Sequence, residues 1–221
     1  MVLSHIEKPI FEPVLDHVKG TFDNVICSGA STLIIQNSSI VLEQYIGQQS
    51  GEKEARAVQA DTQFHVASVR KSYIGFAVSY ALFYCSIKNI DDLVLTYLPE
   101  LDKNIWKDTT IRHLLTHTHG LKQGENGTVR EFTPGSNWAY RQIGIDALTQ
   151  IVKRTTNKSV ADIIHESVFI PLSFNESNWY SKKHNKLVDV MLRYEWDEDW
   201  RTSDSIEGDK MNMYLSTREL A

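Results

Sequence analysis

The stretch that decides the fold is FHVASVRKS, residues Phe64–Ser72. Within it, Ser68 and Lys71 form the pattern Ser-x-x-Lys, and an apolar segment without proline follows at Tyr73–Ile87. If this segment is a helix that starts near Ser68, the hydroxyl and the amine are neighbours, because residues three apart lie on the same helix face. A serine hydroxyl is a poor nucleophile at neutral pH, and a desolvated, neutral lysine can accept its proton. The pattern therefore predicts a nucleophilic serine at the start of a buried helix.

Short patterns of this kind also arise by chance, and the chain holds a second copy, SGEK, at Ser50–Lys53. That copy lies in a polar stretch that contains a glycine and precedes no apolar run, so we interpret it as part of a loop. For Ser68 the alternative role is that of a helix N-cap, whose side-chain oxygen accepts a backbone N–H. The motifs later in the chain favour the nucleophile.

Length and composition suit one globular domain, or two small interleaved ones. The chain has 221 residues, of which 42% are hydrophobic, enough to fill a core. Its net charge of −5, with acids and bases interspersed, argues against a nucleic-acid partner, which would require a basic face. The two cysteines, Cys27 and Cys85, are too few for a disulfide framework, and we expect both to be small buried side chains. No pattern predicts an oligomeric state.

The distribution of apolar residues indicates neither a membrane span nor a secretion signal. Residues Met1–Pro9 lack the apolar core of a signal peptide, so we expect a cytoplasmic protein, or an extracytoplasmic one if a leader was removed. The longest apolar stretch, Ile74–Ile87, is shorter than the roughly 20 residues that a membrane span needs, and serines interrupt it. We therefore expect no membrane span.

The order of the apolar patterns predicts an α+β fold. Helical spacing at Phe11–Phe22 is followed by two β-branched runs, Ser31–Gln36 and Ile40–Ile46, which turn-forming residues join into a hairpin. We expect one domain over residues 1–221, in which 1–60 supply this helix and hairpin and 61–221 are mostly helical. After the central helix we expect a short helix that ends before Pro99, helices at Thr109–Leu115 (with a threonine cap), Tyr140–Thr156 and Ser159–Phe169, and a loop at Gly120–Gly135.

Several phrases resemble the serine β-lactamase and DD-peptidase family, specifically its class C-like branch of β-lactamases, D-Ala-D-Ala carboxypeptidases, esterases and amidases. They occur in the family's order and cover Ser31–Leu172, with a weaker match at Tyr214–Ala221. The phrases are Phe64–Ser72, Ile90–Leu101 (IDDLVLTYLPEL), Ile111–Leu121 (IRHLLTHTHGL), Phe132–Gly144 (FTPGSNWAYRQIG) and Ile170–Leu172 (IPL).

The resemblance implies a β-lactamase/transpeptidase-like fold and a serine hydrolase that cleaves an amide or ester bond through an acyl-enzyme. Its substrate would be a small molecule or peptide-like, and no cofactor is implied. Ser68 would attack, while Lys71 and Tyr140 would share the roles of general base and general acid. The family's second motif, Tyr-x-Asn, corresponds to Tyr140-Arg141-Gln142. We expect the amide of Gln142 to bond Lys71 or a substrate carbonyl, although it is one methylene longer than asparagine.

The family's third motif, Lys-Thr-Gly or His-x-Gly on a late strand, is not found in this sequence. The resemblance implies that C-terminal strands would complete the antiparallel sheet of the N-terminal hairpin and supply one of two oxyanion donors. We therefore expect these 221 residues to be a truncated portion of a longer enzyme, with the hairpin left as a two-stranded sheet. The alternative is a catalytically impaired fragment that serves as a binding or regulatory module, which Gln142, His119 and the missing motif favour.

Two other groups of polar residues could carry chemistry. His113, His117 and His119 resemble metal ligands, but no acid completes a known pattern and the related family has HLLTHTSGL here without a metal, so we expect no metal. The run Asp197–Asp199, between two tryptophans, could suggest the paired carboxylates of a glycosidase. We interpret it as a solvated loop.

Overall fold

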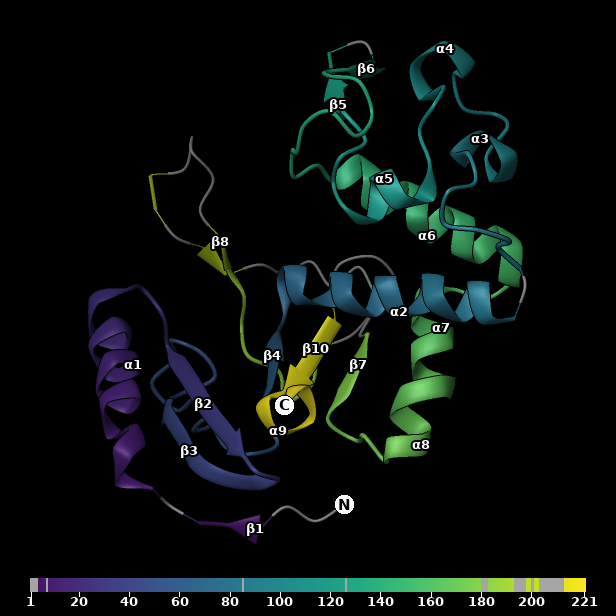
Figure 1. Cartoon of the computed structure of the whole chain (residues 1–221). Coiled ribbons are helices and arrows are strands. Elements are labelled where there is room, and N and C mark those ends of the chain that lie inside the picture. The colour runs from purple at the N-terminus through teal and green to yellow at the C-terminus, as the bar shows by residue number, and fades with distance from the viewer. Residues whose placement is uncertain are drawn as a thin grey trace. The chain divides into compact units, whose positions relative to one another are not determined.

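The computed structural model describes residues 4–6, 8–84, 86–125, 127–179, 183–192, 198–199, 201–202 and 213–221. The chain divides into two compact units, the first made of residues 1–67 and 174–221 and the second of 68–173 (Figure 1). Sheets dominate the first unit and helices the second, so the predicted α+β class is confirmed. The expected single domain with a division near residue 60 stays a prediction.

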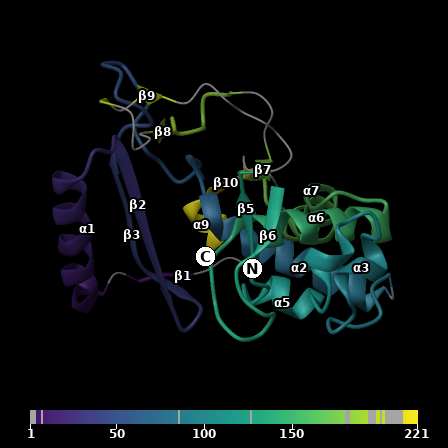
Figure 2. The same cartoon turned by 90° about the horizontal axis from the view of Figure 1, so that it is seen from above.

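A sheet with a helix on it begins the first unit. Strands β2 (Gly29–Gln36) and β3 (Ser39–Gly47) pair antiparallel, as predicted, and α1 (Glu12–Asn24) packs against β2 (Figure 2). The turn residues Asn37 and Ser38 are both left-handed, with φ of 51° and 57°, as two-residue hairpin loops prefer. The sheet was expected to have two strands, but β1 (Ser4–His5) pairs parallel with β3 and makes a third.

A second sheet of the first unit brings together segments that are far apart in the sequence. Its strands are β4 (Gln63–His65), β10 (Met213–Ser216) and β7 (Ser177–Trp179), in the antiparallel order β4-β10-β7. All four residues of the central strand β10 are buried. Strands β8 (Met191–Leu192) and β9 (Arg201–Thr202) form a separate pair, and α9 (Thr217–Leu220) follows β10.

The second unit is built around α2 (Arg70–Phe83). The buried side chains of Ile74, Ala77, Val78 and Ala81 recur every three or four residues, and α2 packs against α6 and α7. No helix among the described residues is long and apolar enough to cross a membrane. The other elements are α3 (Val94–Tyr97), α4 (Lys103–Trp106), α5 (Ile111–Leu115), β5 (Leu121–Gly124), β6 (Gly127–Arg130), α6 (Gln142–Thr156), α7 (Val160–Ile164) and α8 (Ile170–Leu172).

Some element boundaries differ from the sequence predictions. The expected loop at Gly120–Gly135 contains the antiparallel pair of β5 and β6. The helical chain does not end at Phe169 but passes through a π-helical turn, His165–Phe169, into α8, which ends one residue after Pro171. Cys27 is exposed, so its expected burial is wrong, and Cys85 lies outside the described residues.

An ion pair ties the C-terminal helix of the first unit to its hairpin. Arg218 in α9 donates two hydrogen bonds to the carboxylate of Glu43 in β3, at 2.6 and 2.8 Å. The Glu43 side chain is 4% exposed and that of Arg218 is 52% exposed, and the hydroxyl of Tyr45 also donates to Glu43. The guanidinium of Arg218 holds the pKa of Glu43 below its usual value. This carboxylate therefore depends on Arg218 for compensation of its buried charge.

We predict that Arg218→Ala lowers the free energy of unfolding at pH 7 by about 1.5–3 kcal/mol, because a buried carboxylate loses a charged partner. Since the pKa of Glu43 is lowered in the folded protein, the pair's contribution is present above the unfolded pKa and is lost as the pH falls through the folded pKa. The difference in the free energy of unfolding between wild type and variant should therefore become smaller in acid. Urea unfolding at several pH values measures it.

A matched control is Arg112→Ala, which removes an equally bidentate pair with Asp91 at 2.6 and 2.8 Å. Both side chains of that pair are about half exposed, at 51% and 54%. We expect a much smaller loss than in Arg218→Ala, because solvent screens exposed pairs. Equal losses in the two variants would contradict the role given to the burial of Glu43.

Candidate active site

The start of α2 places Ser68 beside Lys71. A 3-10 turn at Ala67–Val69 leads directly into α2, and Ala67 is left-handed with φ of 43°, an uncommon conformation for a residue other than glycine. The Lys71 ammonium donates to Ser68 Oγ at 2.9 Å. The N-cap of α2 is Val69, and no side chain caps it. Ser68 is therefore not the N-cap of α2, and its hydroxyl faces the amine instead.

Tyr140 reaches the same oxygen from the loop that precedes α6. Its hydroxyl donates to Ser68 Oγ at 2.7 Å, across 72 positions of sequence. The Lys71 Nζ atom also lies 4.9 Å from the centre of the Tyr140 ring. Three of the four predicted site residues thus converge on one hydroxyl oxygen.

The charges around the phenol favour its ionised form, which is the form that can accept a proton. The ammonium of Lys71, and next the hydroxyl of Ser68, lower the pKa of Tyr140 below its usual value. Arg70, whose side chain is buried, adds a smaller effect of the same sign. Ser68 is exposed and Tyr140 is 47% exposed, so solvent reaches the cluster. A phenol tuned in this way can move a proton at the serine oxygen.

Gln142, the fourth predicted residue, makes a different contact. It is the first residue of α6, and its Nε2 donates to Asp146 Oδ1 at 3.0 Å, one turn along the same helix. In this structure, therefore, the amide is engaged by Asp146, whereas the sequence led us to expect it on Lys71 or on a substrate.

The histidines near the site have separate structural roles. His113 Nδ1 accepts the Thr110 N–H at 3.2 Å, which completes a capping box at α5 and confirms the predicted threonine cap. His119 is fully buried, its Nδ1 accepts the Leu121 N–H at 3.0 Å, and burial lowers its pKa to about 4. Among the described residues no group of three His, Cys, Asp or Glu side chains could hold a metal ion.

Sequence reasoning missed His117 as part of the site. Its ring lies 4.7 Å, centre to centre, from the Tyr140 ring. The only signal in the sequence was its place in the phrase IRHLLTHTHGL, which suggested a metal ligand rather than an aromatic neighbour.

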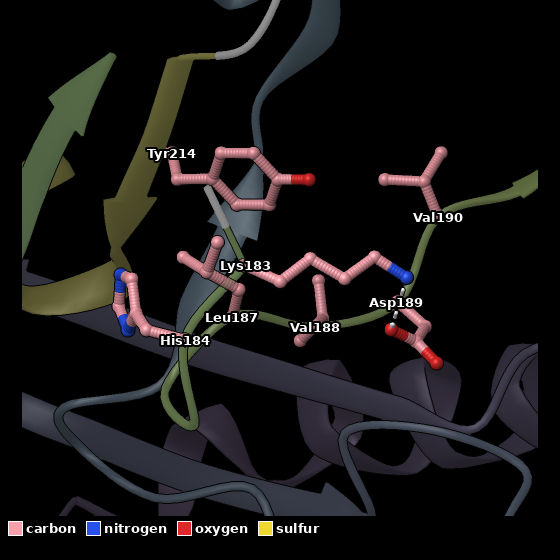
Figure 3. Close-up of a pocket in the computed structure, with 7 residues that line it drawn as sticks. All are labelled: Lys183, His184, Leu187, Val188, Asp189, Val190 and Tyr214. Atoms are coloured by element: carbon pink, nitrogen blue, oxygen red, sulfur yellow. Dashed lines mark ion pairs between the residues drawn. The ribbon is translucent and has the colours of Figure 1, made fainter. Parts of the chain in front are cut away.

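A small hollow in the first unit is a poor candidate for substrate binding. Figure 3 shows its lining, in which Lys183 forms an ion pair with Asp189 at 3.7 Å beside Tyr214. Its volume of about 30 Å³ is far below the roughly 300 Å³ of a small-molecule site. The cluster at Ser68 remains the better candidate.

Comparisons with known proteins show the family of this chain. The Beta-lactamase family model matches residues 18–221, so the chain belongs to the Beta-lactamase family. An uncharacterized protein of Alkalihalophilus pseudofirmus is 54% identical over 211 residues, which are 96% of this chain and 62% of that protein. The chain thus spans less than two thirds of the length of this relative.

Solved structures share the fold. A class C β-lactamase superposes with a TM-score of 0.79 at 18% identity, covering 97% of this chain and 63% of that one. EstCE1, described as a hydrolase with promiscuous acyltransferase activity, superposes with a TM-score of 0.74 at 18% identity, covering 95% and 70%. The predicted resemblance and the β-lactamase-like fold are confirmed.

We predict that Lys71→Met raises the pKa of Tyr140 toward the ordinary value of about 10, because the phenolate loses its nearest cation. Carbon-13 labelling of the nine tyrosine rings, with Tyr140→Phe to assign the signal, follows the titration by NMR. Lys53→Met, at the lysine of the second Ser-x-x-Lys copy, is the control and should leave the titration unchanged. An unchanged Tyr140 titration in Lys71→Met would refute the electrostatic role of Lys71.

Proposed function

We propose that this chain is a serine hydrolase, or the portion of one that carries the nucleophile, and that it cleaves an amide or ester bond through an acyl-enzyme on Ser68. The observation that carries the proposal is the convergence of Lys71 Nζ, at 2.9 Å, and Tyr140 Oη, at 2.7 Å, on Ser68 Oγ. Membership of the Beta-lactamase family supports it.

In the first half of the reaction, Ser68 Oγ attacks the carbonyl carbon of the substrate while its proton passes to Tyr140 Oη. The phenol must be ionised to accept this proton, and the ammonium of Lys71 favours that form. Tyr140 then gives the proton to the leaving nitrogen or oxygen as the bond from the carbonyl carbon to that atom breaks. Ser68 is left as an ester of the acyl group.

Water completes the cycle in the second half. The water oxygen attacks the ester carbonyl while Tyr140 Oη takes a proton from that water. The proton then returns to Ser68 Oγ when the acyl group leaves. The Ser68 N–H, in the first turn before α2, would donate to the oxyanion, because the first N–H groups of a helical segment lack internal partners.

We propose a small-molecule or peptide-like substrate, which leaves β-lactams, D-amino peptides, esters and short amides as candidates. EstCE1 and the class C β-lactamase share the fold at 18% identity, which does not choose among these. A p-nitrophenyl ester and a chromogenic cephalosporin, assayed in parallel, separate esterase from β-lactamase activity. Absence of turnover with both, together with absence of an acyl adduct, would favour the alternative of a binding or regulatory module.

We predict that a fluorophosphonate forms one covalent adduct, on Ser68, and that Ser68→Ala abolishes it. Intact-mass spectrometry followed by peptide mapping measures both. The matched control is Ser50→Ala, in the second Ser-x-x-Lys copy, whose hydroxyl accepts the Glu52 N–H of a loop, and it should label like wild type. An adduct on another residue, or none on the wild-type chain, would overturn the proposed function.

We also predict that Tyr140→Phe slows acylation of Ser68 by about 10²–10⁴-fold, the usual contribution of a positioned proton carrier. The variant retains the ring and the contact between Lys71 and Ser68 but has no phenolic oxygen. The measurement is the rate of fluorophosphonate labelling at fixed pH. A rate within a few-fold of wild type would assign the proton transfer to Lys71 alone.

A further inference from the structure

The turn that follows α5 holds the loop that carries Tyr140. The carbonyl of His117 accepts the Ala139 N–H at 3.0 Å, and the carbonyl of Thr118 accepts the Gly135 N–H at 2.9 Å. These two bonds fix both ends of the segment that leads to Tyr140. His117 itself is left-handed, with φ of 57°, a conformation that non-glycine residues rarely adopt. The left-handed residue His117 is therefore hydrogen-bonded to the residue that precedes Tyr140.

The ring of His117 supports the phenol itself. The rings of His117 and Tyr140 are 4.7 Å apart and tilted by 39°, within the range of favourable aromatic pairs. Trp138 extends this group, with its ring 6.2 Å from that of His117 and 6.4 Å from that of Tyr140. Since Tyr140 is 47% exposed, packing on His117 restricts an otherwise open ring.

The ionisation of His117 suits this role. Burial, and next the charge of Lys71, lower the pKa of His117 below its usual value. The ring is therefore neutral near pH 7 and does not repel the ammonium beside it. Its Nδ1 atom is buried and has no hydrogen-bond partner, so the observed contact of the ring with Tyr140 is one of packing.

We propose that His117 is a positioning residue for Tyr140. Its left-handed backbone holds the residue before the tyrosine, and its ring packs on the phenol, so that Tyr140 Oη stays within hydrogen-bond distance of Ser68 Oγ. This inference rests on the proposed function, in which the phenol carries the proton of Ser68.

The first test removes the ring and keeps the backbone. His117→Gly accommodates a positive φ without strain and should slow fluorophosphonate labelling of Ser68 by about 10–100-fold, as small misplacements of a catalytic group do. His117→Phe, which retains an aromatic ring, should restore the rate to within a few-fold of wild type. The matched control is Asn157→Gly, the same change at the left-handed end of α6, which should label like wild type.

The pH profile gives a readout that a purely structural role would not move. Among the residues that the structure describes, Lys71 and Arg70 are the charged groups with the main effect on the phenol, and both favour its ionised form. A phenol that leaves Lys71 and Ser68 regains a higher pKa, so the rising limb of labelling against pH should move to higher pH in His117→Gly and return in His117→Phe. Thermal melts followed by circular dichroism show whether each variant is folded.

A double-mutant cycle decides whether His117 acts through Tyr140. In a Tyr140→Phe background, His117→Gly should cause no further loss, because the phenolic oxygen that it positions is absent. The same fractional loss in both backgrounds, or an unchanged rate in His117→Gly, would overturn the inference and leave the proposed function intact. Absence of any Ser68 adduct on the wild-type chain would instead overturn the proposed function.

Discussion

Two donors share one acceptor at Ser68 Oγ, and this arrangement depends on how closely two helices pack. Ser68 is fixed by the start of α2, whereas Tyr140 enters from the loop before α6, and the hydroxyl contact between them is 2.7 Å. A shift of α6 against α2 by even an ångström would break that contact, since hydrogen bonds of this kind fail beyond about 3 Å. The buried side chains along both helices therefore act on the chemistry as well as on stability.

Two glycines, Gly120 in the turn after α5 and Gly144 in α6, show how that packing is maintained. An added Cβ on Gly144 would lie 2.6 Å from His119 Nε2, so the glycine lets α6 approach the buried imidazole closely. A Cβ on Gly120, which has φ of 66°, would lie 2.0 Å from the carbonyl oxygen of Phe132. These close approaches draw the turn, the loop and α6 together. The loop that carries Tyr140 is thus held by backbone contacts as well as by the ring contacts of the tyrosine itself.

The sequence predicted well those features that repeat over many residues or depend on short spacings. The pair of Ser68 and Lys71 follows from helical geometry, and the hairpin of β2 and β3 follows from two β-branched runs joined by turn formers. Tyr140 came from resemblance, because no local rule relates a tyrosine to a serine 72 positions earlier. Its arrival at Ser68 was a prediction that only tertiary structure could test.

The features that the sequence did not predict are of two physical kinds. Strands of two to four residues, such as β1 and β10, are too short for a period of two to appear, and their pairing depends on partners far along the chain. The pair of β5 and β6 within 120–135 was hidden by the glycines of that stretch, which we interpreted as a loop. The contact between His117 and Tyr140 belongs to the second kind, since ring packing between two loops leaves no periodic pattern.

Gln142 is the position at which this chain departs from the Tyr-x-Asn motif that it resembles. Glutamine is one methylene longer, and its amide reaches Asp146 at 3.0 Å. Asp146 in turn favours the charged form of the buried Arg70, so the contact belongs to a network that compensates a cation next to Lys71. We infer that this departure from the motif bears on substrate selectivity rather than on the proposed chemical step, because Lys71 and Tyr140 still converge on Ser68 while the Gln142 amide is engaged by Asp146.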